Sequence, residues 1–237
     1  MAEAVAQQNN QLELLMRERT NTGSSRTNNG LVESQGYIVE KNFWDPEELY
    51  HPVPRERGQI FYFGSIDRFQ NNPEDPQVPG AYSRGNHPQY KQIFNGIRKK
   101  LQTVLDAKLY GSFYYDRFYF EGQKLNKYID QDSAEIIVRM NISNNLEEPW
   151  PVHLKTPDTY TDKQKSAILV PGEEKKIDLE PGDALIYKGC ERPVWRDVIP
   201  QNKNNRKLFG KKKEYYYHEI AFNFVLANGI RSHMTSS

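Results

Sequence analysis

Three side chains of this sequence are candidates to hold one metal ion together: Asp130, His153 and His218. An iron centre for oxygen chemistry uses two histidines and one carboxylate on one side of the metal and leaves the other positions open. Tyr128 stands two positions before Asp130, and this spacing places both side chains on the same side of a strand. A histidine at position 128 would complete a His-x-Asp pair, so the tyrosine raises the question of whether this chain is an enzyme.

The histidines near strand-like stretches have two interpretations. His153 lies between two apolar residues, and His218 directly precedes the stretch EIAFNFV, so either could point into a barrel. With Asp130, and with Glu135 as a further carboxylate, they would form a rearranged metal site. Alternatively, each is a hydrogen-bonded histidine of the core or of the surface. The other histidines fall in loops or in the C-terminal tail: His51, His87 and His233.

Composition argues against several classes of protein. Thirty-two Lys and Arg against thirty-one Asp and Glu give a net charge of +1, which argues against a protein that coats nucleic acid or an anionic membrane. Cys190 is the single cysteine, so a reducing compartment is expected. No apolar run approaches the roughly 18 residues that span a bilayer, and no signal peptide opens the chain, so we expect a soluble protein. The motifs GxxxxGK, GxSxG and HExxH are missing.

The elements that would position these residues are mostly strands. Apolar residues recur at helical spacing only from Gln89 to Lys108, which predicts one helix. A Pro-rich surface loop is expected from Asn71 to Pro88. Proline and glycine punctuate a series of short strand-like runs, which is typical of a sandwich or barrel with a helix packed outside. The predicted strands are residues 37–44, 59–63, 110–120, 134–142, 150–155, 166–170, 175–179, 183–188, 193–198 and 215–226.

Two segments are candidates for binding a partner protein. Residues 1–36 form an N-terminal arm and linker, in which a short helix carries Leu12, Leu15 and Met16. The segment QNKNNRKLFGKKK has six positive charges and no negative one, and it is either a solvated loop or a docking surface. Its basic residues are Lys203, Arg206, Lys207, Lys211, Lys212 and Lys213. Residues 37–237 then form the folded domain.

Four runs of the folded domain carry a resemblance to a known family. They are GSFYYDRFYFEGQKLNKYID, PWPVHLKTPDTYTDKQ, EPGDALIYKGCERPVWRD and YYYHEIAFNFVLANG. Over roughly residues 37–234 the chain resembles the iron and 2-oxoglutarate-dependent dioxygenases of the prolyl 4-hydroxylase-like type, particularly those that tailed phages of marine cyanobacteria encode. The resemblance implies a mainly β, double-stranded β-helix, which is a jelly-roll or cupin-like fold, with one supporting helix outside.

The resemblance also implies where a metal site would lie. The first histidine, the carboxylate and the distal histidine of the family fall on Tyr128, Asp130 and Val194, and the basic residue that would pair with 2-oxoglutarate falls near His218. Valine ligates nothing, and Tyr128 either ligates ferric iron through its phenol or fills the space of a metal. The resemblance therefore implies a degenerate metal site.

Two functional hypotheses follow. In the first, the chain is a pseudoenzyme without metal or cofactor, and it serves as a structural or assembly component of a phage particle, at the neck, tail or capsid. Its partners are then protein subunits, including copies of itself, rather than membranes or nucleic acid, and its location is the virion, assembled in the host cytoplasm. In the second, it is a cytoplasmic Fe(II) and 2-oxoglutarate hydroxylase whose altered metal site uses Asp130, His153 and His218.

Overall fold

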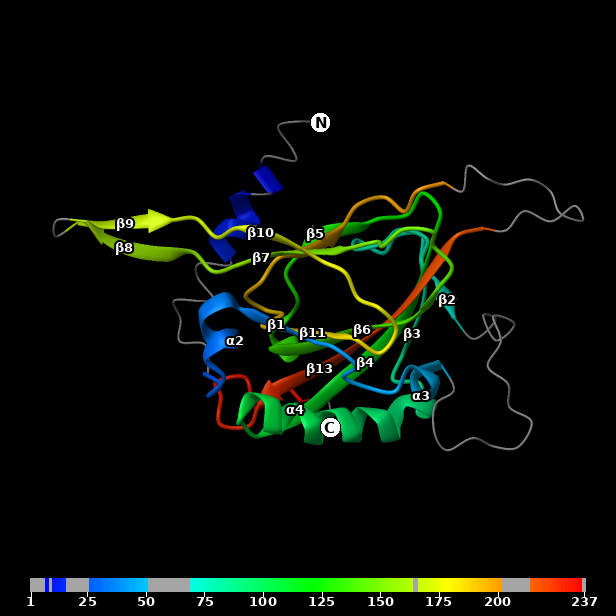
Figure 1. Cartoon of the computed structure of the whole chain (residues 1–237), viewed down its shortest axis with the longest axis horizontal. Coiled ribbons are helices and arrows are strands. Elements are labelled where there is room, and N and C mark those ends of the chain that lie inside the picture. Colours follow the sequence, from blue (N-terminus) through cyan, green and yellow to red (C-terminus); the bar gives the residue numbers. More distant parts are fainter. Residues whose placement is uncertain are drawn as a thin grey trace, which may run out of the picture.

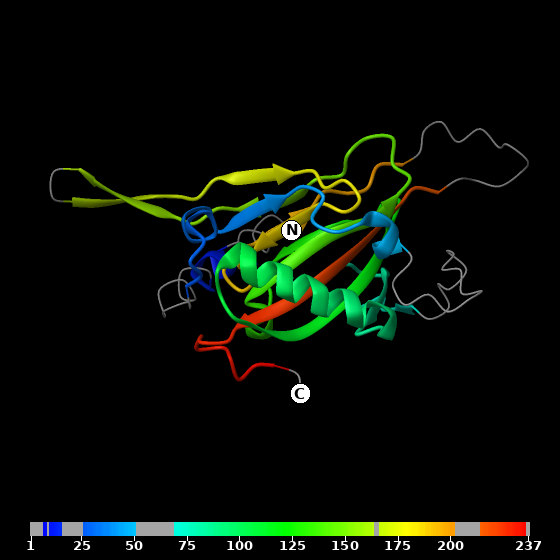
Figure 2. The ribbon, with the colours of Figure 1, turned by 60° about the horizontal axis from the view of Figure 1, so that its bottom comes forward.

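The computed structural model describes residues 7–8, 10–15, 26–50, 69–163, 166–201 and 214–235 of the chain. Two antiparallel β-sheets lie over one another, and one long helix covers the outside of the larger sheet (Figure 1). This is the mainly β arrangement with an outer helix that the sequence predicts. Figure 2, turned towards the helix, shows it running across the strands of the larger sheet.

The larger sheet has seven strands and the smaller one has four. In spatial order, the larger sheet consists of β1 (Tyr37–Glu40), β11 (Ala184–Tyr187), β6 (Ile136–Asn144), β13 (Tyr216–Leu226), β4 (Leu109–Phe120), β3 (Tyr82–Gly85) and β2 (Gln70–Asn71). The smaller sheet consists of β10 (Glu174–Ile177), β7 (Val152–Lys155), β12 (Val194–Arg196) and β5 (Leu125–Tyr128). The space between the sheets is the barrel interior.

The central strand β13 presents a different face to each layer, because neighbouring side chains of a strand point to opposite sides. Ile220, Phe222 and Phe224 are fully buried in the apolar cluster that includes the long helix. Glu219 and Ala221 point to the barrel interior, where Ala221 packs among residues of both sheets. The more apolar face of β13 therefore packs on the helix, and its more polar face lines the barrel.

The long helix, α4 (Lys91–Leu105), is held by its apolar stripe. Phe94 stacks on Phe224 of β13 with 4.9 Å between ring centroids. Burial contributes about 1.5–3 kcal/mol for each large apolar side chain. The helix ends at Leu105, and the C-cap residue Asp106 has a left-handed φ of 45°. The buried residues of the stripe are Ile93, Ile97, Leu101 and Leu105.

A hairpin projects from the body of the molecule. Strands β8 (Thr159–Lys163) and β9 (Ser166–Val170) pair only with each other among the described strands. Both views show this hairpin extending beyond the two sheets (Figures 1 and 2). Its base is closed by a hydrogen bond from the Thr156 amide to the Glu173 carbonyl, 2.9 Å long.

The described residues of the N-terminal segment contact the folded domain. Helix α2 (Gly30–Gln35) buries Val32 in the same cluster as α4. Residues 10–15 are helical, and Glu13 forms an ion pair with Lys155 of β7 at 3.2 Å. The division of the chain at residue 36 stays a prediction.

Several local predictions differ from the structure. The expected surface loop from Asn71 to Pro88 contains β3, which pairs with β4. Strand β5 was not predicted, and the predicted strand 59–63 lies outside the described residues. The remaining short helices are α3 (Pro46–Tyr50), η2 (Pro88–Tyr90) and η3 (Asp132–Ala134). In the described part of the chain, no helix is both long and apolar enough to cross a membrane.

Candidate functional site

Positions 128 and 194 lie opposite each other in the smaller sheet. Tyr128 ends β5 and Val194 begins β12, and the two are paired residues of these antiparallel strands. Val194 is fully buried and Tyr128 is half-buried, and both pack in the cluster of the barrel interior. The structure thus brings together the two positions at which the resemblance implies histidines.

Asp130 lies just beyond the end of β5. Its carboxylate accepts a hydrogen bond from the Tyr187 hydroxyl, 3.3 Å long, and its amide donates to the Gly189 carbonyl at 3.1 Å. Tyr187 belongs to β11 and packs in the interior cluster. Asp130 is thus tied to the larger sheet beside the interior, with 7% of its surface exposed.

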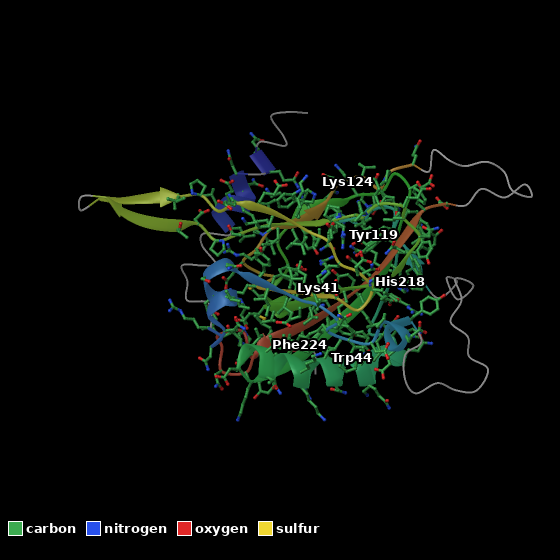
Figure 3. The ribbon with its side chains drawn as sticks, viewed as in Figure 1. Lys41, Trp44, Tyr119, Lys124, His218 and Phe224 are labelled. Atoms are coloured by element: carbon green, nitrogen blue, oxygen red, sulfur yellow. The ribbon has the colours of Figure 1, made fainter. Side chains whose placement is uncertain are left out.

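A buried ionic bridge fills the interior beside these residues. Arg139 of β6 and Arg196 of β12 both form ion pairs with Glu219 of β13, and all three side chains are at most 1% exposed. Arg196 Nη2 is 2.9 Å from Glu219 Oε2, and the Tyr119 hydroxyl donates to Oε1 at 2.6 Å. Arg139 also donates to the Tyr128 hydroxyl at 2.7 Å. The Tyr128 hydroxyl therefore accepts a hydrogen bond from a buried guanidinium. Tyr119, which contacts the Glu219 carboxylate, lies between the two sheets in Figure 3.

Burial and the two guanidiniums set the protonation states of this bridge. Burial alone would raise the pKa of Glu219, but Arg139, Arg196 and the Tyr119 hydroxyl outweigh it and lower the pKa to about 2. Burial raises the pKa of Tyr128 well above its ordinary value. At neutral pH the carboxylate is charged and the Tyr128 phenol keeps its proton.

His218 lies on the outer face of the larger sheet. Its neighbour Glu219 points into the barrel, so His218 points the opposite way. Its ring stacks on Phe118 with centroids 3.8 Å apart, and its Nε2 is 2.9 Å from Asp116 Oδ2. Arg84 holds the same carboxylate at 2.9 Å. The expectation that His218 could point inward is wrong, because the inward face of β13 is the one with the glutamate.

His153 lies on the outer face of the smaller sheet. Its neighbours Val152 and Leu154 are both buried in the barrel cluster, so His153 points away from it. Its Nδ1 is 2.7 Å from Glu174 Oε1, and its ring stacks on Trp195. Of the two interpretations of His153, the inward-pointing one is therefore also wrong, and the structure shows the hydrogen-bonded histidine. The two histidines lie on the outer faces of different sheets, and neither shares a face with Asp130.

The residues of this site do not fit an iron centre of the two-histidine type. Of the three implied ligand positions, only Asp130 has a side chain that binds metals, and Val194 has none. Throughout the described ranges, no group of three or more His, Cys, Asp or Glu residues could hold a metal ion. The altered site of Asp130, His153 and His218 is not assembled either.

The residues predicted to bind partners have different outcomes. Leu12 lines a groove of about 580 Å³ between the N-terminal helix and the smaller sheet, together with Lys127 and Trp195. Leu15 is half-buried. Both therefore lie in a helix that contacts its own chain, and partner binding stays a prediction. Met16 and the basic residues Lys203, Arg206, Lys207, Lys211, Lys212 and Lys213 lie outside the described residues.

Sequence reasoning missed the three charged residues of the interior bridge. Arg139, Arg196 and Glu219 each stand beside apolar residues of a predicted strand, in the runs IIVRM, PVWR and EIAF. Charged residues are almost never fully buried unless they are paired, so charges within predicted core strands are a signal for a buried ion pair. That signal could have found these residues.

Comparisons with known proteins show the fold. No protein-family model matches the chain, and no curated protein matches its sequence. A Pseudomonas putida prolyl-4-hydroxylase structure covers 81% of this chain and 95% of its own, with TM-score 0.53 and 11% identity. A Burkholderia pseudomallei oxidoreductase of the 2OG-Fe(II) oxygenase family covers 90% and 98%, with TM-score 0.53 and 10% identity. A non-heme α-ketoglutarate-dependent carbocyclase from nogalamycin biosynthesis covers 84% and 83%, with TM-score 0.55 and 8% identity.

These comparisons confirm the predicted fold and correct two predictions. The sequence led us to expect a protein that is not an enzyme and that has no cofactor. The neighbours in fold are a hydroxylase, an oxygenase-family oxidoreductase and a carbocyclase, so both expectations are contradicted. At such low identity the likeness shows the fold alone, and the side chains at the site are this chain's own. The chain has the jelly-roll fold of the 2-oxoglutarate and Fe(II) oxygenases.

Proposed function

We propose that this chain serves as a structural or assembly component of a phage particle, and that it docks on partner protein subunits through the β8–β9 hairpin. The observation that carries the proposal is the projection of this hairpin beyond both sheets (Figure 1). A two-stranded hairpin is at best marginally stable in water, and its outer edges offer backbone groups to another chain. A partner strand that pairs with either edge would stabilise the hairpin.

The sequence of the hairpin supports the same function. Strand β9 reads SAILV, and the described end of it leaves Val170 with 40% of its surface exposed. Val170 therefore offers an apolar contact beside a strand edge that can pair with a partner strand. The assignment to a virion rests on the sequence resemblance to proteins that tailed phages encode.

Removal of the hairpin tests this proposal. Thr159 pairs with Val170 at the base of the hairpin, so a Gly-Ser-Gly turn can join Asp158 to Pro171 with little strain. We expect this variant to keep its circular dichroism spectrum and melting temperature but to be missing from purified particles. Particles that incorporate it at the wild-type level would contradict the docking role.

A pair of single substitutions gives the matched control. Val170→Lys places a charge on the hairpin, and Tyr110→Lys places one at another exposed large side chain, on β4, with 49% of its surface exposed. We expect Val170→Lys to reduce incorporation and Tyr110→Lys to leave it unchanged. Equal effects of the two would show that general surface charge, rather than the hairpin, controls incorporation.

The second candidate is a 2-oxoglutarate and Fe(II) hydroxylase whose metal ligands differ from the set of Asp130, His153 and His218, since His218 contacts Asp116 and His153 contacts Glu174 instead. The observation behind it is the shared fold, because the neighbours with a TM-score above 0.5 include a prolyl-4-hydroxylase and an oxidoreductase of the 2OG-Fe(II) oxygenase family. Its test is the iron content of the purified chain together with succinate formation from 2-oxoglutarate. Stoichiometric iron and substrate-dependent succinate would favour the hydroxylase, and particle incorporation without turnover would favour assembly.

A further inference from the structure

The carboxylate of Glu219 is surrounded by donors from three strands. Arg139 of β6 pairs with Oε1, Arg196 of β12 pairs with Oε2 at 2.9 Å, and the Tyr119 hydroxyl of β4 donates to Oε1 at 2.6 Å. Two guanidiniums and a hydroxyl that converge on one carboxylate form a strong, directional recognition site for this group. The carboxylate bridges the two sheets, since β12 belongs to the smaller sheet and β6 to the larger one.

Other contacts hold the Arg139 guanidinium in place. It donates to the Tyr128 hydroxyl at 2.7 Å and to the Tyr187 hydroxyl at 3.2 Å. Neither contact involves Glu219. The position and direction of this donor are therefore fixed by the surrounding barrel, and not only by the carboxylate it binds.

The Arg196 guanidinium is fixed in a similar way. It lies over the rings of Trp150 and Tyr217, at 4.6 and 4.5 Å from their centroids. It also donates to the backbone carbonyl of Trp150 and to the hydroxyl of Tyr217. A donor set that keeps its geometry without its ligand is preorganised, and preorganisation is what gives a site affinity for a free ligand.

We propose that Arg139, Arg196 and Tyr119 form a carboxylate-binding site inside the barrel, which Glu219 occupies in this chain and which binds a small free carboxylate when the Glu219 side chain is shortened. The proposal does not depend on the assembly role. Glu219→Ala removes two carbon and two oxygen atoms, which are the heavy atoms of acetate. Acetate therefore matches the vacated space in size as well as in charge.

The test is rescue of Glu219→Ala by acetate. The full-length variant is unfolded in urea and refolded in sodium acetate or in sodium chloride of equal ionic strength and pH, with wild type in parallel. With acetate at about ten times its Kd, the unfolding equilibrium constant of the variant should fall about tenfold relative to chloride. Wild type should show no such difference. A variant that folds equally well in both salts, with no stabilisation by acetate, would overturn the proposal.

Two controls separate a carboxylate site from a general effect of the salt. Acetamide has the size of acetate but no charge, and it should not stabilise Glu219→Ala. Glu219→Gln keeps the volume of the side chain, so acetate has no space there and should not stabilise this variant. Stabilisation of Glu219→Gln by acetate, or of Glu219→Ala by acetamide, would contradict a preformed carboxylate site.

A second variant covers the case in which Glu219→Ala does not fold. Glu219→Ala leaves two buried guanidiniums without their carboxylate, and the double variant R196M/E219A leaves only one. Arg139 and Tyr119 remain as donors to a bound carboxylate. Acetate should stabilise this variant as well, by a smaller factor than in Glu219→Ala if both fold. Failure of acetate to stabilise the folded double variant would also overturn the proposal.

Discussion

Tyr128 and Val194 face each other across β5 and β12, at the two positions where the resemblance to dioxygenases implies iron-binding histidines. The strand geometry of such a site is thus present, while its two nitrogen ligands are not. The backbone thus places positions 128 and 194 side by side, and only the two side chains differ from those of an iron site. Substitution of these two side chains can therefore test the site.

Restoring both histidines should create a metal site. Opposed residues of an antiparallel pair have Cβ atoms about 4.5–5.5 Å apart, and histidine nitrogens bind metals at about 2.0–2.1 Å. We expect Y128H/V194H to bind about one equivalent of Co(II), with visible absorption bands typical of nitrogen and oxygen ligands. The measurement is a Co(II) titration followed by absorption spectroscopy.

The control for this prediction is Y128H/V194H/D130N, which removes the carboxylate but keeps the imidazoles. It should bind Co(II) at least tenfold more weakly, because even the loss of a group that only supports a metal ligand commonly lowers the affinity by about 10–100-fold. Equal binding by wild type and by Y128H/V194H would show that positions 128 and 194 do not form the site.

The ionic bridge should be costly to break and much less costly to replace as a whole. Arg139→Met removes one of the two guanidiniums that pair with the buried Glu219 carboxylate. Removal of one partner of a buried ion pair lowers the free energy of unfolding by about 3–5 kcal/mol. Replacement of all three charges by apolar residues, in R139M/R196M/E219L, should cost far less, because no charge then remains buried. Urea unfolding of both variants measures the difference. A triple variant less stable than the single variant would contradict this view of the bridge.

The bridge should also make the stability of the chain sensitive to acid. The pKa of Glu219 is lowered from its ordinary 4.5 to about 2 by Arg139, Arg196 and Tyr119, which outweigh the opposing effect of burial. A carboxyl with a lowered pKa in the folded state stabilises the fold above pH 4.5, and this contribution is lost as the pH falls towards 2. The lowering corresponds to on the order of 3 kcal/mol.

Comparison with Glu219→Gln isolates this contribution. The variant should be less stable than wild type at pH 7, and the gap between the two should narrow as the pH falls from about 5 to 2. Because the pKa of Asp116 is also lowered and that of Glu135 is raised, the difference between the two proteins is measured rather than the total. A gap that stays constant over this range would show that Glu219 is not the titrating group.

The fold was predictable because its strongest determinants are local. The helical spacing from Ile93 to Leu105 and the punctuated strands are visible in the sequence, and the structure contains those that fall in its described residues to within a few residues. It was harder to predict which face of each strand points into the barrel. On β13 the apolar residues Phe222 and Phe224 face α4 rather than the barrel, so hydrophobicity pointed to the wrong face for His218. Partners that are distant in sequence, such as the arginines of Glu219, are determined only by the assembled sheets.

His218 should behave as a structural residue of the outer face and not as a metal ligand. Burial lowers the pKa of His218, against the opposing effect of Asp116, so the folded state favours the neutral ring. The stability that depends on this ring is present above its ordinary pKa of 6.5 and is lost as the pH falls below that value. His218→Phe keeps a ring stacked on Phe118 and leaves Asp116 bound to Arg84, so we expect a cost below about 1.5 kcal/mol. Its stability should also fall less than that of wild type between pH 7 and 5.

Asp116→Ala provides the contrast to His218→Phe. It leaves the Arg84 guanidinium, whose side chain is only 9% exposed, without its carboxylate, and this should cost about 3–5 kcal/mol. The ratio of the two costs, measured by urea unfolding at pH 7, tests whether Arg84 or His218 is the main partner of Asp116. If His218→Phe were the more damaging variant, or if it changed the metal content of the purified protein, His218 would have a role beyond packing on the outer face of the sheet.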